Sequence, residues 1–224
     1  MNKYLITAFV AILFLGGACT ATRVVKPLEE KEVQIGLDVG GPRVNSQTIP
    51  LTSLHFAYGF RENLSMFGGI HTTTLGFQTI QLDFGWTYGL LDQKGVVPGI
   101  ALNTVMNPMI SLRDGAFRYY HELTPNFYWE LGNKNKHLFH LGFNNWFDFA
   151  PGTVEIGEGH IWHPSLQAGY RYQMKRFVLA AEYRMLNINK EIVVPQATVP
   201  NLIGSGGHGF YFSVNYRFNH FKED

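Results

Sequence analysis

Hydrophobic and polar residues alternate with a period of two along most of the chain after Glu32. In residues 33–40, for example, valine, isoleucine and leucine alternate with glutamine, glycine and aspartate. This alternation is typical of a β-strand with one apolar face, because successive side chains point to opposite sides. We expect ten strands of this kind, at residues 33–40, 53–60, 64–71, 81–90, 99–103, 122–131, 139–144, 166–173, 177–184 and 210–218.

The connections between these strands are of two kinds. Those after the second, fourth, sixth and eighth strands are short and rich in turn residues, at 61–63, 92–95, 133–136 and 175–176. Those after the first, fifth, seventh and ninth strands are longer, at 41–49, 107–115, 150–161 and 187–208, while the connection at 72–75 is brief. Short turns on one side, longer loops on the other and an even strand number are typical of outer-membrane barrels. The sequence therefore predicts an all-β fold, a closed antiparallel up-and-down transmembrane β-barrel of about 10 strands at residues 33–218.

Aromatic residues gather next to the short turns and next to the last strand's end. Such a ring at one rim is typical of the aromatic girdle that meets the membrane interface. The alternative is that β-strands favour aromatic residues wherever they lie. The predicted girdle consists of Tyr58, Phe60, Trp86, Tyr88, Phe127, Trp129, Tyr170, Tyr172, Tyr216 and Phe218. A second group is expected near the other rim, at Tyr119, Trp146, Phe149, Trp162 and Phe210.

Alternation alone leaves open which face of the barrel meets lipid. The alternative to a membrane barrel is a soluble lipocalin-like barrel on a lipid anchor, with its apolar face around a ligand cavity. The polar face is crowded with Gly, Ala, Ser and Gln, which suits a narrow lumen. A water-facing exterior normally carries more lysine and glutamate. Lysines instead fall mainly in turns and loops, so the pattern favours lipid outside; examples are Lys94, Lys134, Lys136, Lys175 and Lys190.

The amino-acid composition further limits the classes of protein to which the chain can belong. Hydrophobic residues make up 46% of the chain and charged residues only 16%, against about 25% in a typical soluble domain. Eighteen basic residues nearly balance seventeen acidic ones, so no strong field exists for nucleic acid. One cysteine excludes an internal disulfide framework and a multi-cysteine zinc site.

The amino terminus carries a predicted secretory signal peptide at residues 1–18. Lys3 precedes the apolar run at residues 4–15, which is shorter than the roughly 20 residues of a membrane-spanning helix. Residues 19–32 are polar and indicate a short tether or extended lead-in to the barrel.

The end of this leader, Leu15-Gly16-Gly17-Ala18-Cys19, resembles the lipobox of bacterial lipoproteins. Gly16 stands where the lipobox usually has leucine. The resemblance implies cleavage before the cysteine and lipidation of Cys19. An ordinary signal peptide, cut after Ala18 or Ala21, is the alternative.

The barrel region, residues 33–218, resembles small outer-membrane β-barrel proteins of Gram-negative bacteria. Residues 58–64 look like the turns of such barrels, and the last strand partly matches their assembly signal. Tyr216 and Phe218 occupy the two hydrophobic positions of that signal, although Ser213 replaces the usual glycine and a tail follows at 219–224. The resemblance implies a place in the bacterial outer membrane, with its lipid and, during biogenesis, the barrel-assembly machinery as partners.

Charged residues on the polar face are expected to line the lumen, where buried charges must be paired. Closure of the barrel is expected to bring Asp38 near Arg217. We predict a structural ion-pair network that plugs the lumen; a narrow conducting path is the alternative. The network consists of Asp38, Asp83, Glu122, Glu130, Asp148, Glu182, Arg118, Arg171, Arg184 and Arg217.

Two constellations suggest catalysis only weakly. His163 and Ser165, with Glu182 on the next strand, distantly resemble the His-x-Ser arrangement of outer-membrane lipid A deacylases, but Leu166 stands where that family has Asn. Asp83 with His140 or Asp148 could imitate the site of ten-stranded outer-membrane proteases.

The histidines on the long-loop side are scattered and match no metal motif. We therefore predict no catalytic, cofactor or metal site and a non-enzymatic barrel. Its role is structural or surface recognition through the long loops. The alternatives are a small solute channel and a loop-side lipid or peptide hydrolase.

Overall fold

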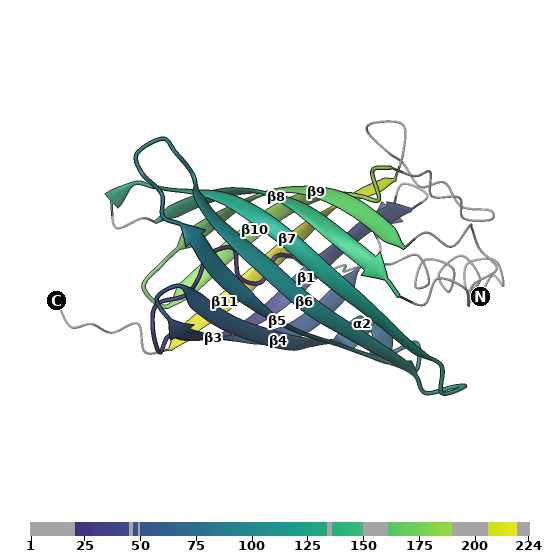
Figure 1. Ribbon diagram of the computed structural model, residues 1–224. Coiled ribbons are helices and arrows are strands. Elements are labelled where there is room, and N and C mark those ends of the chain that lie inside the picture. Colours follow the sequence, from purple (N-terminus) through teal and green to yellow (C-terminus); the bar gives the residue numbers. More distant parts are fainter. Residues whose placement is uncertain are drawn as a thin grey trace.

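The computed structural model describes residues 21–44, 47–48, 50–133, 136–149, 161–189 and 206–218. Strands occupy nearly all of these ranges (Figure 1). In chain order the elements are β1 (Val33–Val44), β2 (Gln47–Thr48), β3 (Leu51–Arg61), β4 (Leu64–His71), α2 (Thr72–Leu75), β5 (Thr79–Leu91), β6 (Gly99–Ser111), β7 (Phe117–Leu131), β8 (His137–Asp148), β9 (Trp162–Gln173), β10 (Phe177–Leu186) and β11 (Gly207–Phe218).

The strands form one antiparallel sheet that closes on itself. Each long strand pairs with the next one along the chain, and β11 pairs with β1 to complete a barrel of 10 strands. In this closing seam Val33 lies opposite Phe218, and Leu37 lies opposite Val214. The short β2 pairs only with the end of β1 in the described part of the sheet. The fold class predicted from the alternation is therefore confirmed.

The alternation separates an apolar exterior from a polar interior. On β1 the side chain of Leu37 is 49% exposed, whereas its neighbour Asp38 is 1% exposed. On β11 the same contrast holds between Val214, at 47%, and Asn215, at 0%. Apolar side chains thus cover the outside and polar ones are enclosed. The reverse arrangement, a soluble barrel with an apolar cavity, is excluded because the exposed face is the apolar one.

The two ends of the barrel differ in their connections. The hairpins joining β3 to β4, β7 to β8 and β9 to β10 lie at the end that also holds the last residue of β11 (Figure 1). We call this the short-turn end and the other the long-loop end. The predicted loop at 107–115 is wrong in part, because β6 continues to Ser111. Asn107 and Pro108, which we took as loop residues, pair with Tyr120 and Tyr119 of β7.

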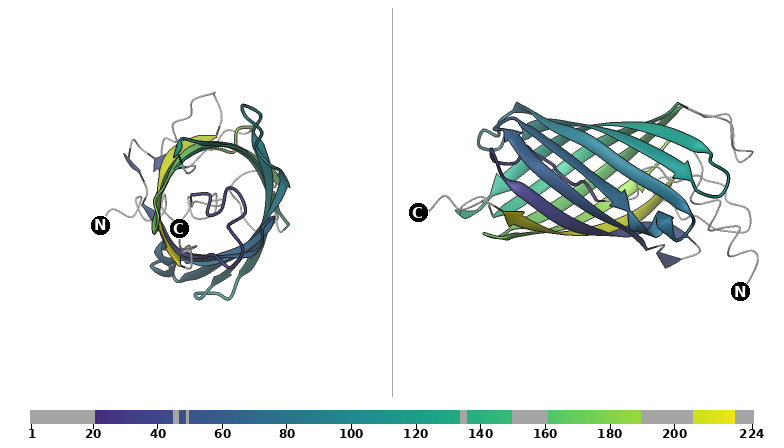
Figure 2. Two further views of the ribbon diagram at one scale, coloured as in Figure 1. Left: turned by 90° about the vertical axis from the view of Figure 1, so that its left-hand side faces the viewer. Right: turned by 90° about the horizontal axis from the view of Figure 1, so that it is seen from below.

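Residues 21–32 lie inside the barrel, and we call them the inner segment. Figure 2 shows this part of the chain, in purple, within the ring of strands. The side chains of Ala21, Thr22, Arg23, Val24 and Val25 are buried, at 1–6% exposure. The segment ends at the short-turn end, where it continues directly into β1. From the sequence we expected a tether here, and a position in the lumen was not predicted.

The predicted signal peptide at 1–18, Cys19 and the tail at 219–224 lie outside the described residues. Most of the predicted loops at 150–161 and 187–208 do so too. Among the residues that are described, no helix has the length and apolarity needed to cross a membrane.

Candidate functional site

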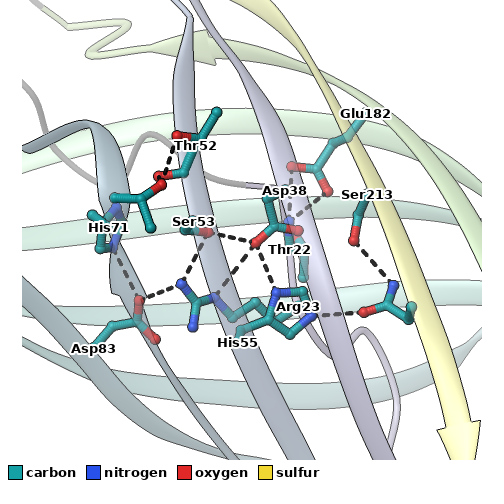
Figure 3. A network of polar contacts seen from close by, with 12 residues as sticks. Thr22, Arg23, Asp38, Thr52, Ser53, His55, His71, Asp83, Glu182 and Ser213 are labelled. Atoms are coloured by element: carbon teal, nitrogen blue, oxygen red, sulfur yellow. Dashed lines mark hydrogen bonds and ion pairs between the residues drawn. The ribbon is translucent and has the colours of Figure 1, made fainter.

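The lumen is organised around Arg23, the single arginine of the inner segment. Its Nη2 lies 2.5 Å from Oδ2 of Asp83 on β5 and donates to the Ser53 hydroxyl on β3 at 3.3 Å. Its Nε lies 3.9 Å from Oδ2 of Asp38 on β1. All of these side chains are buried, and Figure 3 shows the arginine pointing between the two carboxylates. One guanidinium thus bridges two acidic groups of the barrel wall.

Each of these aspartates has a histidine as a further partner. The Nδ1 of His55 lies 2.9 Å from Asp38 Oδ2, and the Nε2 of His71 lies 3.0 Å from Asp83 Oδ2. The other ring nitrogen of His55 lies 2.6 Å from the Asn215 side-chain oxygen on β11. The network therefore continues from the inner segment through β3 to the closing seam.

Thr22 connects the inner segment to the opposite wall. Its backbone N–H faces both carboxylate oxygens of Glu182 on β10, at 3.2 and 3.3 Å. Its hydroxyl accepts hydrogen bonds from Gln167 at 2.8 Å and from Arg184 at 3.0 Å. Glu182 is also ion-paired with Arg184 and hydrogen-bonded to His140 at 2.9 Å. Two adjacent residues of the segment thus hold opposite sides of the barrel.

Backbone carbonyls of the inner segment are also bound by the wall. Arg171 donates to the carbonyl of Arg23 at 3.0 Å, and Asn103 donates to that of Val24 at 2.7 Å. A buried carbonyl without a partner is costly, so these donors replace the water that the segment would meet in solution.

The final part of the inner segment is also held by charged and polar groups of the wall. The Lys26 Nζ lies 2.8 Å from Glu130 on β7, and the backbone N–H of Leu28 donates to the Ser65 hydroxyl at 2.7 Å. Glu32 accepts two hydrogen bonds from Arg217 on β11, at 2.6 and 3.0 Å.

Gly59 permits the close approach of the inner segment to β3. Its N–H donates to the Glu32 carbonyl and its carbonyl accepts from Lys31, both at 2.8 Å. A Cβ at this position would lie 1.9 Å from the Glu29 carbonyl oxygen, so the approach requires glycine.

Free space in the lumen is uneven. Beside Ala21–Arg23 a cavity of about 30 Å³ remains, enough for little more than one water molecule. At the short-turn end a cavity of about 670 Å³ lies between residues 24–29 of the inner segment and the wall formed by β7 to β11. The lumen is therefore filled at Arg23 and open towards the short turns.

The predicted lumen residues fall largely inside the barrel. Eight of the ten are buried: Asp38, Asp83, Glu122, Asp148, Arg171, Glu182, Arg184 and Arg217. Glu130 and Arg118 are partly buried, towards the short-turn and long-loop ends respectively.

The expected approach of Asp38 to Arg217 is wrong. In the β1–β11 register Asp38 lies opposite Ser213, and Arg217 lies opposite Gln34. Arg217 instead binds Glu32, and Asp38 is bound by Arg23 and His55. Their counter-charges are Arg23 and Glu32 of the inner segment, and His55 adds a hydrogen-bond contact to Asp38. We had not included these residues in the predicted network. The only sequence signal for the part played by the inner segment was the presence of the charged residues Arg23, Lys26 and Glu32 just before the first strand.

Glu122 is held by neutral donors in the described contacts. It accepts hydrogen bonds from Thr124 at 3.0 Å, Asn144 at 2.5 Å and the Trp146 indole at 2.9 Å. Trp146 lies near the long-loop end of β8, as expected, but it is only 4% exposed and so does not belong to an outward-facing aromatic girdle. On β8 it lies on the inward-facing side, because residue 146 has the same parity as buried His140 and Asn144.

The predicted girdle residues lie on outward-facing positions towards the short-turn end. Phe60 is 55% exposed and Tyr88 is 47% exposed. Neighbouring rings pack on one another, as between Tyr216 and Phe218, whose centroids are 4.7 Å apart. Their contact with the membrane interface remains a prediction.

The described contacts do not assemble the two hydrolase constellations. His163 faces the Asn187 side chain at 3.3 Å, and Ser165 accepts from the Asn187 backbone at 3.1 Å. Asp83 binds His71 and Arg23, while His140 binds Glu182. A nucleophile needs a base within hydrogen-bond reach, and these contacts show no such pair. In the described ranges, no group of three or more metal-ligating side chains comes together.

These features define a class. A closed β-barrel has no unpaired strand edge, and an apolar exterior around a polar interior is the arrangement that crosses a bilayer. The chain therefore has the closed up-and-down fold and the apolar outer surface of a membrane-spanning β-barrel, as small outer-membrane barrels do.

No protein-family model and no curated protein matches this chain. Among solved structures, the chain is similar to Ail, the attachment invasion locus protein of Yersinia pestis (11% identity, 84% of this chain and 99% of that chain, TM-score 0.29). It is also similar to the KdgM porin (8% identity, 83% and 99%, TM-score 0.44). A third is the N-terminal β-barrel domain of OprF from Pseudomonas aeruginosa (10% identity, 85% and 100%, TM-score 0.32). At these identities and scores the likeness carries no inference about function.

Proposed function

We propose that this protein is a non-enzymatic outer-membrane barrel with a plugged lumen, which serves the envelope as a structural element or through recognition by its long loops. The observation that carries the proposal is the bridge from Arg23 to Asp38 and Asp83. Buried charges that bridge two walls are costly to separate. An inner segment held in this way blocks the passage that a channel needs. Its partners are the outer-membrane lipid and, during biogenesis, the barrel-assembly machinery.

Single-channel recording in planar bilayers tests the plug. The wild-type protein is expected to show no conductance steps. Arg23→Ala removes the bridging charge and is expected to give steps or frequent brief openings. Arg113→Ala, in the exposed loop between β6 and β7, removes the same charge without touching the lumen and serves as the matched control.

Two outcomes decide whether the lumen is plugged, and a second variant covers the case in which the first does not fold. Silent wild type with a conducting Arg23→Ala variant supports the plug. Steady steps in the wild-type protein contradict it. If Arg23→Ala fails to give the heat-modifiable gel shift of a folded barrel, Asp83→Asn replaces it, because the change weakens the same bridge from the wall side.

The alternative is a small solute channel. It is favoured by the cavity of about 670 Å³, which already occupies the short-turn end of the lumen. On this view the inner segment leaves its site during transport. Wild-type conductance steps that Glu182→Ala alters would support the channel, because Glu182 binds the backbone of Thr22.

We further propose that the mature chain begins at Cys19 and carries lipid there. The lipobox resemblance supports this. The wild-type protein is expected to incorporate labelled palmitate and Cys19→Ala to lose the label. Label retained by the variant would refute lipidation at this residue.

A further inference from the structure

Among the described residues, Arg171 on β9 is a buried cation with no carboxylate at ion-pair distance. It is 6% exposed, and its one described hydrogen bond runs from Nη1 to the carbonyl of Arg23 at 3.0 Å. Its Nε has no hydrogen-bond partner, and no carboxylate of the described residues lies within ion-pair distance of it. The neighbouring arginines differ, since Arg184 pairs with Glu182 and Arg217 pairs with Glu32.

A buried arginine that has one hydrogen bond and no ion pair carries an uncompensated desolvation cost. Removing a guanidinium from water costs several kcal/mol unless an anion or a set of acceptors replaces the water. One backbone carbonyl supplies a single acceptor for a group that has five N–H donors. The position is therefore prepared for an additional anionic partner.

Arg171 also lines the cavity of about 670 Å³ at the short-turn end. This volume is within the range of about 300–1,000 Å³ that small-molecule sites occupy. The charged side chains of its lining are five cations, Lys26, Lys136, Arg171, Lys175 and Arg217, and three acids, Glu29, Glu32 and Glu130. The cations exceed the acids by two, so the cavity attracts anions.

The cationic side chains lie at different depths of the cavity. Lys136 and Lys175 belong to the turns that follow β7 and β9, at the open rim. Arg171 lies further in, two residues before the end of β9, where the inner segment forms the floor. An anion entering from the short-turn side passes the two lysines before it reaches the arginine.

We propose that this cavity is a binding site for a small dianion carrying carboxylate or phosphate groups. Arg171 is the anchoring residue and Lys136 a steering residue at the rim. The guanidinium suits this task because its fork of N–H groups matches the two oxygens of a carboxylate or phosphate. The site rests on the inner segment being seated, since residues 24–29 form part of its lining.

Titration calorimetry of the folded full-length chain in detergent micelles, at constant ionic strength, tests the site. The probes are succinate and hydrogen phosphate, which separate a carboxylate ligand from a phosphate ligand, with butane-1,4-diol as the neutral analogue. We expect one of the two anions to bind saturably and the diol not to bind. Arg171→Gln is expected to weaken binding at least tenfold.

Lys94→Gln is the matched control, because Lys94 is an exposed lysine in the β5–β6 connection at the same end and lies outside the cavity lining. It is expected to change binding less than twofold. Equal weakening by both variants would overturn the proposal, since it would indicate a diffuse charge effect only. Absence of saturable binding by either anion would also overturn it.

If Arg171→Gln does not fold, Lys136→Gln takes its place, because Lys136 is exposed and its replacement leaves the interior intact. A two- to fivefold loss is expected, and no loss would contradict the steering role. The conductance experiment keeps this proposal separate from the plug. A silent wild-type protein that binds no anion refutes the site alone, whereas a conducting protein with Arg171-dependent binding refutes the plug alone.

Discussion

The inner segment has two parts that meet the barrel wall in different ways. The anchored part, Ala21–Arg23, contacts charged or polar groups on β1, β3, β5, β9 and β10 and leaves only about 30 Å³ of space. The open part, Lys26–Glu29, borders a cavity of about 670 Å³. The difference teaches that the segment is packed tightly against the wall at Ala21–Arg23, whereas between Lys26 and Glu29 its contacts leave space for a cavity.

The contrast also separates two kinds of ion pair. Arg23 and its aspartates are buried on both sides, with side-chain exposures of 5% or less. Lys26 and Glu130 are exposed by 34% and 14%. Water screens the second pair and not the first, so the two pairs are expected to differ in energetic weight by several kcal/mol.

The largest expected effect is that of Arg23→Ala. The change leaves Asp38 and Asp83 without their shared cation, and breaking a buried pair from one side costs about 3–5 kcal/mol. Denaturant unfolding of the barrel in lipid vesicles measures the loss of free energy of unfolding. A loss below about 1 kcal/mol would contradict the anchoring role.

A double variant provides the internal control for that measurement. Adding Asp83→Asn to Arg23→Ala removes the uncompensated carboxylate and is expected to restore part of the lost stability. Arg113→Ala, in the exposed loop, is expected to stay within about 0.5 kcal/mol of wild type.

A smaller effect is expected from Gly69→Ala on β4. The added methyl group would lie 1.9 Å from Arg23 Nη1 and 2.5 Å from the Leu54 carbonyl oxygen. Overpacking of this kind costs about 1–3 kcal/mol. The adjacent Gly68→Ala is the matched control, because its nearest atoms lie 3.1 Å and farther away. Equal unfolding free energies for the two variants would show that Arg23 does not occupy this site.

The smallest effect is expected from Lys26→Ala in the open part. Its half-exposed pair with Glu130 is worth at most about 1 kcal/mol. The variant is therefore expected to unfold almost like wild type and to remain silent in bilayer recordings. A loss as large as that of Arg23→Ala would abolish the distinction between the two parts.

The wall of the barrel could be predicted from the sequence because the face on which a strand residue lies depends only on its immediate neighbours in the chain. A strand places neighbouring side chains on opposite faces, so alternation at Leu37 and Asp38 is enough to assign outside and inside. Strand ends were less predictable. Asn107 and Pro108 have loop propensities, yet pairing with β7 keeps them in β6.

The contacts of the lumen could not be predicted in the same way. Which charges meet depends on the register of the strands and on what fills the lumen. The two-residue alternation of hydrophobic and polar residues specifies neither. Asp38 and Arg217 lie on adjacent strands and still bind other groups. The inner segment itself carries no alternation, and its charges at Arg23, Lys26 and Glu32 fit an exposed tether as well as a lumen segment.

The position of the inner segment has a consequence for the seam that closes the barrel. The segment precedes β1, and it contacts Asp38 on the first strand and Glu182 on the next-to-last, 160 residues from Thr22. The β1–β11 seam joins the two most distant strands of the chain, and a long loop must close before that pairing forms. The segment is attached to β1 and binds β10, the neighbour of β11, from within, so its contacts link the two sides of this seam. The closed barrel encloses it, so these internal links are shielded from the surroundings of the barrel.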